Sequence, residues 1–223
     1  MRFSLIPQQF ALVPHFNWVR AAIGAFCGIA ATGLLCRLWL GTTVGDLPLL
    51  VAPLGASAVL GFALPASPLA QPWSIVGGNF VSALVGVAVA KLVPDVDVAA
   101  GIAVGGAILG MALARCLHPP GGAIALTAVI GAPAIHAAGW HYALFPVGLN
   151  SAMLVALAWL FNNASGHSYP HRAMTVTPVA KQPVEAQDID AALADYDELI
   201  DVSGEDLLAL FMAAEAKAEA RRR

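Results

Sequence analysis

The sequence predicts an all-α polytopic membrane protein with two inverted repeats, each made of a span, a half-helix and a span, followed by a short acidic helical tail. Of the 223 residues, 59 % are hydrophobic and 11 % are charged, whereas soluble domains are about 25 % charged. Several apolar stretches are about 20 residues long, which is the length of a helix that crosses a bilayer. Two shorter apolar stretches are bracketed by proline and resemble each other.

Four apolar stretches are long enough to cross the roughly 30 Å hydrocarbon core of a membrane. They are Trp18–Leu40, Ser74–Val93, Val98–Leu117 and His141–Phe161. Tryptophans stand near several of their ends, as in an interfacial aromatic belt, although simple packing explains these positions as well. Arg20 and Arg37 lie near the ends of the first stretch, and we interpret them as side chains that reach for the interface.

Two further apolar stretches, Pro53–Leu64 and Pro120–Ala132, are too short to span. Twelve helical residues cover only about 18 Å. An apolar run of about 10–14 residues is more often re-entrant or buried than spanning. We therefore expect two half-helices.

The two short stretches align with each other in sequence. Pro53-Leu-Gly-Ala-Ser-Ala-Val-Leu60 matches Pro119-Pro-Gly-Gly-Ala-Ile-Ala-Leu126. Each short stretch stands between two full spans, which predicts an inverted repeat, although small-residue matches also arise by chance. The expected transmembrane domain covers 18–165, with repeats at about 18–93 and 98–161, after an N-terminal segment 1–17.

The half-helices predict an anion site near the middle of the membrane. Proline suits the start of a helix, and a helix start carries free N–H groups and about half a positive charge. Two such ends would hold a small anion without a buried lysine. The candidate substrate-binding residues are Gly55, Ala56, Ser57, Asn79, His118, Pro119, Pro120, Gly121, Gly122 and Asn150, with Arg115 as a residue that attracts anions.

Plainer interpretations of the same residues stay open. Glycine in membrane helices more often serves close packing than ligand binding. Asn79 and Asn150 can equally form hydrogen bonds between helices, and Arg115 can be an anchor at the membrane surface. The three cysteines match no metal motif, and we expect neither a metal nor a cofactor.

The segment Arg115-Cys-Leu-His-Pro-Pro-Gly-Gly-Ala-Ile-Ala-Leu126 resembles the signature of the HPP family of integral membrane proteins, which is named for its His-Pro-Pro. The resemblance covers roughly Arg20 to Pro170 and includes four more segments. These are Ala52-Pro-Leu-Gly-Ala-Ser-Ala-Val-Leu60, Ser67-Pro-Leu-Ala-Gln-Pro72, Gly77-Gly78 with Ser82-Ala-Leu-Val-Gly86, and Asn162 to Pro170.

The resemblance implies a polytopic membrane protein that is commonly described with four membrane helices. Plant and cyanobacterial members of this family are implicated in nitrite transport, and many bacterial relatives carry tandem CBS domains. Three positions depart from the family pattern: Trp73 stands where arginine is common, Asn79 where histidine is common and Ile124 where threonine is common.

Charge separates the apolar body from the tail. Met1–Phe161 carry five basic and three acidic residues, and the rest carries six basic and eleven acidic residues. We expect a linker at 166–187 and two short amphipathic helices within 188–223, which either form a hairpin or serve dimerisation or regulation. Positive charges favour cytoplasmic N- and C-termini, and the residue types suggest a bacterial inner membrane.

Three functions are weighed. The leading hypothesis is a permease or channel for a small inorganic monoanion such as nitrite. The second is a non-transporting membrane scaffold or sensor. The third, an intramembrane enzyme with Ser57 and His118 as nucleophile and base, is disfavoured because no acidic residue lies deep in a span to orient the histidine. Expected partners are the lipid bilayer, a small anion and a second copy of the chain, and with a net charge of −3 nucleic acid is excluded.

Overall fold

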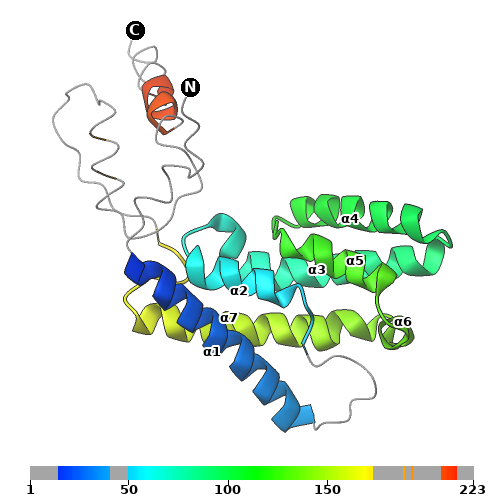
Figure 1. Ribbon diagram of the computed structural model, residues 1–223. Helices are drawn as coiled ribbons and strands as arrows, with labels where there is room; N and C mark the ends of the chain where they lie inside the picture. Colours follow the sequence, from blue (N-terminus) through cyan, green and yellow to red (C-terminus); the bar gives the residue numbers. More distant parts are fainter. Residues whose placement is uncertain (1–14, 41–49, 173–187, 189–191, 193–206, 215–223) are drawn as a thin grey trace, which may run out of the picture. The chain divides into compact units, whose positions relative to one another are not determined.

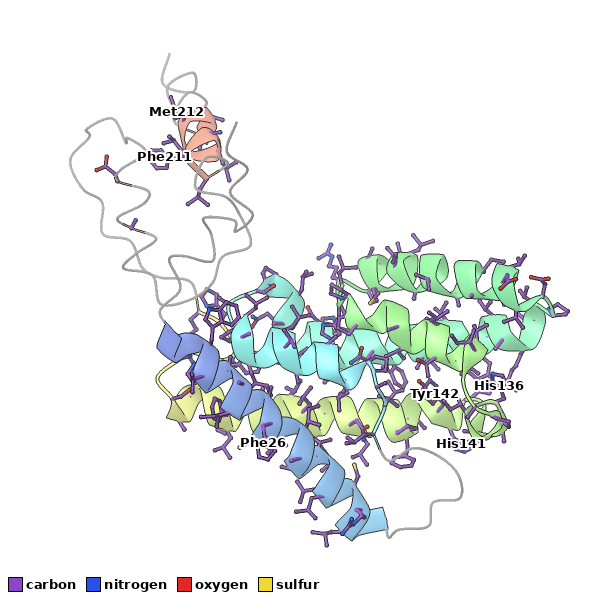
Figure 2. All side chains as sticks on the ribbon, in the orientation of Figure 1. Phe26, His136, His141, Tyr142, Phe211 and Met212 are labelled. Atoms are coloured by element: carbon purple, nitrogen blue, oxygen red, sulfur yellow. The ribbon has the colours of Figure 1, made fainter. Side chains whose placement is uncertain are left out.

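The computed structural model describes residues 15–40, 50–172, 188, 192 and 207–214 (Figure 1). The chain separates into two compact units, one of residues 18–172 and one that combines 1–17 with 173–223. In the second unit, 207–214 are helical, with Leu210, Phe211 and Met212 exposed; Figure 2 labels the last two. The predicted N-terminal segment, most of the linker and most of the tail lie outside the described residues.

Four long apolar helices dominate the unit of residues 18–172. They are α1 (His15–Leu40), α3 (Pro72–Leu92), α4 (Val96–Leu113) and α7 (Leu149–Ala164), the last extended by η3 (Ala143–Gly148). Each contains a stretch that is long and apolar enough to cross a membrane. The predicted all-α polytopic class is therefore confirmed.

Two short apolar helices, α2 (Leu54–Ala63) and α5 (Pro120–Ile130), stand where the half-helices were predicted. A short turn of helix, η2 (Pro68–Ala70), follows α2, and α6 (Pro133–Ala138) follows α5. Neither of these small elements was predicted, because helices of 3 and 6 residues are too short to show an apolar period.

The last span begins with a break that the sequence argument missed. Phe145 has φ −139° and ψ 127°, which are not helical values, and Pro146 lies in the same segment. Proline cannot donate a backbone hydrogen bond and clashes with the preceding turn. The predicted continuous helix His141–Phe161 is therefore divided into η3 and α7.

Helix α5 packs against both α3 and α4, which also contact each other (Figure 1). It runs parallel to α3, because Gly78 lies beside His118 and Gly86 lies beside Ala125. A Cβ atom added to Gly121 would lie 2.5 Å from the Ser82 hydroxyl, and one added to Gly86 would lie 2.5 Å from the Ala125 carbonyl oxygen. Both helices therefore approach each other at backbone distance, as small residues allow in membrane proteins.

Helix α2 lies beside α7 and also runs parallel to it. The turn before α2 contacts the start of α7, where the Val51 amide donates to Asn150, and the end of α2 contacts the end of α7, where Asn162 donates to the Gly61 carbonyl. Each short helix thus packs on a long helix from the other predicted repeat. The inverted repeat itself stays a prediction, and this crosswise packing is compatible with it.

Arg20 joins the start of α1 to the ends of α2 and α7. Its guanidinium donates to the Phe62 carbonyl at 3.0 Å, to Asn162 Oδ1 at 2.9 Å and to the Ser165 hydroxyl at 3.2 Å. The side chain is buried. The structure therefore corrects the interpretation of Arg20 as a side chain that reaches for the interface.

Candidate functional site

The candidate site lies where the two short helices begin. Ser57 in the first turns of α2 contacts His118, which stands two residues before α5. Asn79 of α3 contacts Ser151 of α7, and both lie in the middle third of their spans. The start of α2 and the residue two positions before α5 therefore lie level with the middle third of the apolar spans that contain α3 and α7.

A directed chain of hydrogen bonds fixes His118. Its Nδ1 lies 2.8 Å from the Leu69 carbonyl oxygen, which can only accept, so Nδ1 carries the proton. In the neutral ring Nε2 must then accept. The Ser57 hydroxyl, 2.8 Å away, donates to it.

Asn79 extends this chain across the bundle. Its Nδ2 donates to Ser57 Oγ at 3.3 Å and to Ser151 Oγ at 3.0 Å, so both amide hydrogens are used. Its Oδ1 and the Ser82 hydroxyl are buried, and neither has a hydrogen-bond partner within the described part of the chain. Ser57, Asn79, Ser82, His118 and Ser151, here called the central cluster, are all 0 % exposed.

Asn150 has a different position from its predicted counterpart Asn79. Its Oδ1 accepts from the Val51 amide at 3.3 Å, and its Nδ2 donates to Cys36 Sγ at 3.3 Å. It therefore ties the turn before α2 to α1 and α7. The neighbouring Ser151, which the sequence argument did not select, joins the central cluster instead.

The backbone amides at the half-helix starts are not free, in contrast to the sequence prediction. At α2 the Gly55 amide donates to the Ala52 carbonyl at 3.1 Å, and at α5 the Gly121 amide donates to the His118 carbonyl at 2.9 Å. Pro53 already has helical dihedral angles, as does the proline before α5, so the preceding turn supplies carbonyl partners. The positive end of each helix dipole is still present. The hydrogen-bond donors of the candidate site, however, belong to side chains and not to these backbone amides.

The other predicted residues divide between the interior and the surface. Pro120 and Gly121 are buried and Gly122 is partly buried, whereas Gly55, Ala56 and Pro119 are exposed. Gly55 has open space where a Cβ would stand. Gly121 packs against a member of the central cluster, because a Cβ there would lie 2.5 Å from Ser82 Oγ.

Arg115 is exposed at the end of α4 and has a positive φ of 53°. The carbonyl of the preceding residue, Ala114, accepts from the Trp73 indole at 3.1 Å. Arg115 therefore lies at the edge of the bundle and outside the central cluster.

The segment that bonds His118 is itself anchored from outside the spans. The Tyr169 hydroxyl donates to the Ala70 carbonyl at 2.8 Å, next to the Leu69 carbonyl that binds His118. Burial raises the pKa of Tyr169, so its hydroxyl keeps its proton and donates at any physiological pH. No period in the sequence indicates this contact, because it joins two segments without regular apolar patterning.

Comparisons with known proteins agree with a membrane protein of this kind. A family model described as HPP, transmembrane region, matches residues 11–170. A transmembrane protein of Dictyostelium discoideum is 38 % identical over 154 residues, which cover 66 % of this chain and 48 % of that protein. Another transmembrane protein of that organism is 36 % identical over 130 residues, which cover 56 % of this chain and 45 % of that protein. The chain spans about half the length of these curated relatives, and no solved structure matches it.

Proposed function

We propose that this chain, which belongs to the HPP family of transmembrane proteins, is a permease or channel for a small inorganic monoanion. The observation that carries the proposal is the central cluster, a set of five buried polar side chains near the starts of the two short helices. Polar side chains at this depth are costly and mark substrate paths. Discontinuous helices near the midplane form the substrate sites of many transporters.

The chemistry of the central cluster favours an anion over a cation. Three hydroxyls and the amide of Asn79 supply hydrogen-bond donors, and none of the five side chains is a carboxylate. The starts of α2 and α5 add two partial positive charges of about 0.5 each. Together they offset about one negative charge, which favours a monoanion.

Nitrite is the first candidate substrate. Its planar shape and two oxygen acceptors suit a site made of hydroxyl and amide donors. Nitrate and formate share these features, and chloride is likewise a small inorganic monoanion that accepts hydrogen bonds. The relatives' names say only that those proteins are transmembrane, so they do not choose among these anions.

In the described conformation the central cluster is closed. Ser57 donates to His118, and both amide hydrogens of Asn79 are bonded to Ser57 and Ser151, so these donors are already used. Access requires the start of α5 to separate from α2 or α3. An anion that accepts from Ser57 and Asn79 would replace bonds that the closed state already makes, which keeps binding weak enough for release.

Flux into proteoliposomes tests the proposal. Purified protein reconstituted with nitrite, nitrate, formate or chloride on one side should give flux above that of protein-free vesicles. The control is wild-type protein unfolded before reconstitution. Folded protein that transports none of the four anions overturns the proposal.

A scaffold or sensor is the second candidate, and the close packing of the bundle favours it. A Cβ on Gly78 would lie 2.6 Å from both the Cys116 carbonyl oxygen and His118 Cβ. The segment before α5 is therefore packed tightly against α3 and has little room to move. Absence of flux from folded protein would select this candidate. We propose no catalytic role, because the Ser57 hydroxyl is sealed from water and no carboxylate orients His118.

A further inference from the structure

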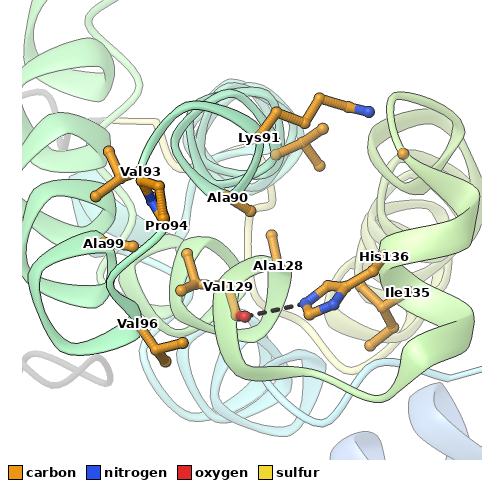
Figure 3. Close-up of a pocket in the computed structure, with 12 residues that line it drawn as sticks. Ala90, Lys91, Val93, Pro94, Val96, Ala99, Ala128, Val129, Ile135 and His136 are labelled. Atoms are coloured by element: carbon orange, nitrogen blue, oxygen red, sulfur yellow. Dashed lines mark hydrogen bonds between the residues drawn. The ribbon is translucent and has the colours of Figure 1, made fainter.

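A second feature lies far along the bundle from the central cluster. A half-open cavity of about 300 Å³ lies where α3 ends, α4 begins and α5 gives way to α6 (Figure 3). This volume is at the lower end of the range for small-molecule pockets. None of the residues of the central cluster lines it.

The walls of this cavity are mostly hydrocarbon, with polar groups along one side. Val87, Val96, Val129 and Ile135 are among the apolar lining residues, and Lys91 and His136 are the side chains that carry nitrogen. Figure 3 shows the His136 ring directed toward Val129 across the cavity wall, where its Nε2 donates to the Val129 carbonyl at 2.9 Å. The cavity is therefore amphipathic.

The turn after α6 lies beside the ammonium group of Lys91. Gly139 has a φ of +50°, a conformation that side chains disfavour, and a Cβ there would lie 3.6 Å from Lys91 Nζ. This glycine lets the chain turn close to the ammonium group. The positive charge consequently lies beside the apolar walls.

The depth of the cavity fits a lipid headgroup. Lys91 is the next-to-last residue of α3, and Val96 is the first of α4, so both stand at the end of a span. Trp140, one residue after Gly139, is half exposed, as aromatic side chains at the membrane interface are. A small hydrated anion gains nothing from hydrocarbon walls, whereas a lipid brings both a charged group and a chain.

We propose that this cavity binds an anionic phospholipid, with its phosphate beside Lys91 and part of an acyl chain against Val96, Val129 and Ile135. Charge complementarity selects the headgroup, because basic pockets between membrane helices attract anionic lipids. The apolar walls select a lipid over a free phosphate. This proposal is independent of anion transport.

Native mass spectrometry of the full chain in neutral detergent tests the site, with phosphatidylglycerol compared to phosphatidylcholine of the same acyl chains. The wild type should retain phosphatidylglycerol preferentially. Lys91→Gln should lower its affinity about fivefold. Arg37→Gln is the matched control, because it removes an exposed charge from α1, which does not line the cavity. Equal retention of phosphatidylglycerol by the wild type and Lys91→Gln overturns the proposal.

A second measurement uses the wild type alone and does not depend on the folding of a variant. Glycerol 3-phosphate at a hundredfold excess should fail to displace bound phosphatidylglycerol, because it lacks the chain that the apolar walls bind. Displacement by glycerol 3-phosphate would show a small-anion site and overturn the lipid assignment. Equal retention of the two lipids by the wild type would overturn it as well.

Discussion

The Ser57 hydroxyl donates to His118 Nε2 at 2.8 Å across a separation of 61 residues, and this bond joins the beginnings of the two short helices. Both side chains are fully buried. Because His118 Nδ1 bonds the Leu69 carbonyl, the ring has one acceptor left, and Ser57 fills it. In the proposed anion site, this bond would have to open before the Ser57 hydroxyl could donate to an anion.

The Ser57→Ala substitution tests the role of this hydroxyl in anion transport. If Ser57 donates to a bound monoanion, its loss removes a hydrogen bond to a charged group, which contributes about 1.5–3 kcal/mol. The half-saturating concentration for nitrite flux should rise by at least about tenfold. Ser168→Ala is the control, because Ser168 is exposed and bonds only the Pro170 carbonyl among the contacts described. Unchanged saturation of Ser57→Ala would remove Ser57 from the anion path.

Asn79→Asp tests the preference of the central cluster for anions. The aspartate has nearly the same shape as asparagine but replaces two donors with a negative charge. Like charges brought together in a site cost several kcal/mol, so nitrite flux should fall by more than about tenfold. Asn163→Asp, at an exposed position that bonds the Trp159 and Tyr169 carbonyls, is the matched control. Similar flux from both variants would argue that the anion does not pass Asn79.

The sequence predicted the spans and short helices well because apolar length and proline are local signals. Pro53 and Pro120 mark the starts of α2 and α5 in the sequence and in the structure. The break at Phe145 was missed, since Pro146 stands in an otherwise apolar run. A proline near the end of a span does not say whether the helix stops, bends or continues.

The sequence predicted three side chains of the candidate site but not the groups that they bond to. Ser57, Asn79 and His118 were expected together, and the structure brings them together. Ser151 and the Leu69 carbonyl were not expected, because their roles depend on which face of α7 meets α3 and on the path of a short turn. Both depend on tertiary packing, which the periodicity of the sequence does not reveal.

Two glycine substitutions test the close packing of α3 on α5. A Cβ on Gly86 would lie 2.5 Å from the Ala125 carbonyl oxygen and 2.8 Å from Ala125 Cα, so Gly86→Ala should destabilise the protein by about 1–3 kcal/mol. Gly101 in α4 has open space at that position. There alanine should stabilise the helix by up to about 1 kcal/mol. Unfolding of both variants in detergent measures the difference, and a Gly86→Ala protein as stable as Gly101→Ala would contradict the packing.

Arg20 provides a test of the tie between α1, α2 and α7. Arg20→Lys keeps the charge but cannot direct donors to the Phe62 carbonyl, Asn162 and Ser165 together, because it lacks the planar fork of arginine. The free energy of unfolding of the Arg20→Lys variant should be about 1.5–3 kcal/mol lower than that of the wild type. Arg37→Lys, at an exposed position, should leave stability unchanged. If both lysine variants unfold like the wild type, Arg20 contributes only its charge.

The proximity of Ser57 and His118 also permits a direct test of catalysis. A serine that is hydrogen-bonded to a histidine base can attack an electrophile, but here the hydroxyl is sealed from solvent and also accepts from Asn79. His118 is oriented by a backbone carbonyl, which cannot stabilise the imidazolium that forms in a serine hydrolase as a carboxylate does. A fluorophosphonate probe should therefore label the folded wild type no faster than Ser57→Ala, as followed by intact-protein mass spectrometry. Labelling that requires both Ser57 and His118 would instead show an activated nucleophile and would move the enzyme hypothesis from third place to first.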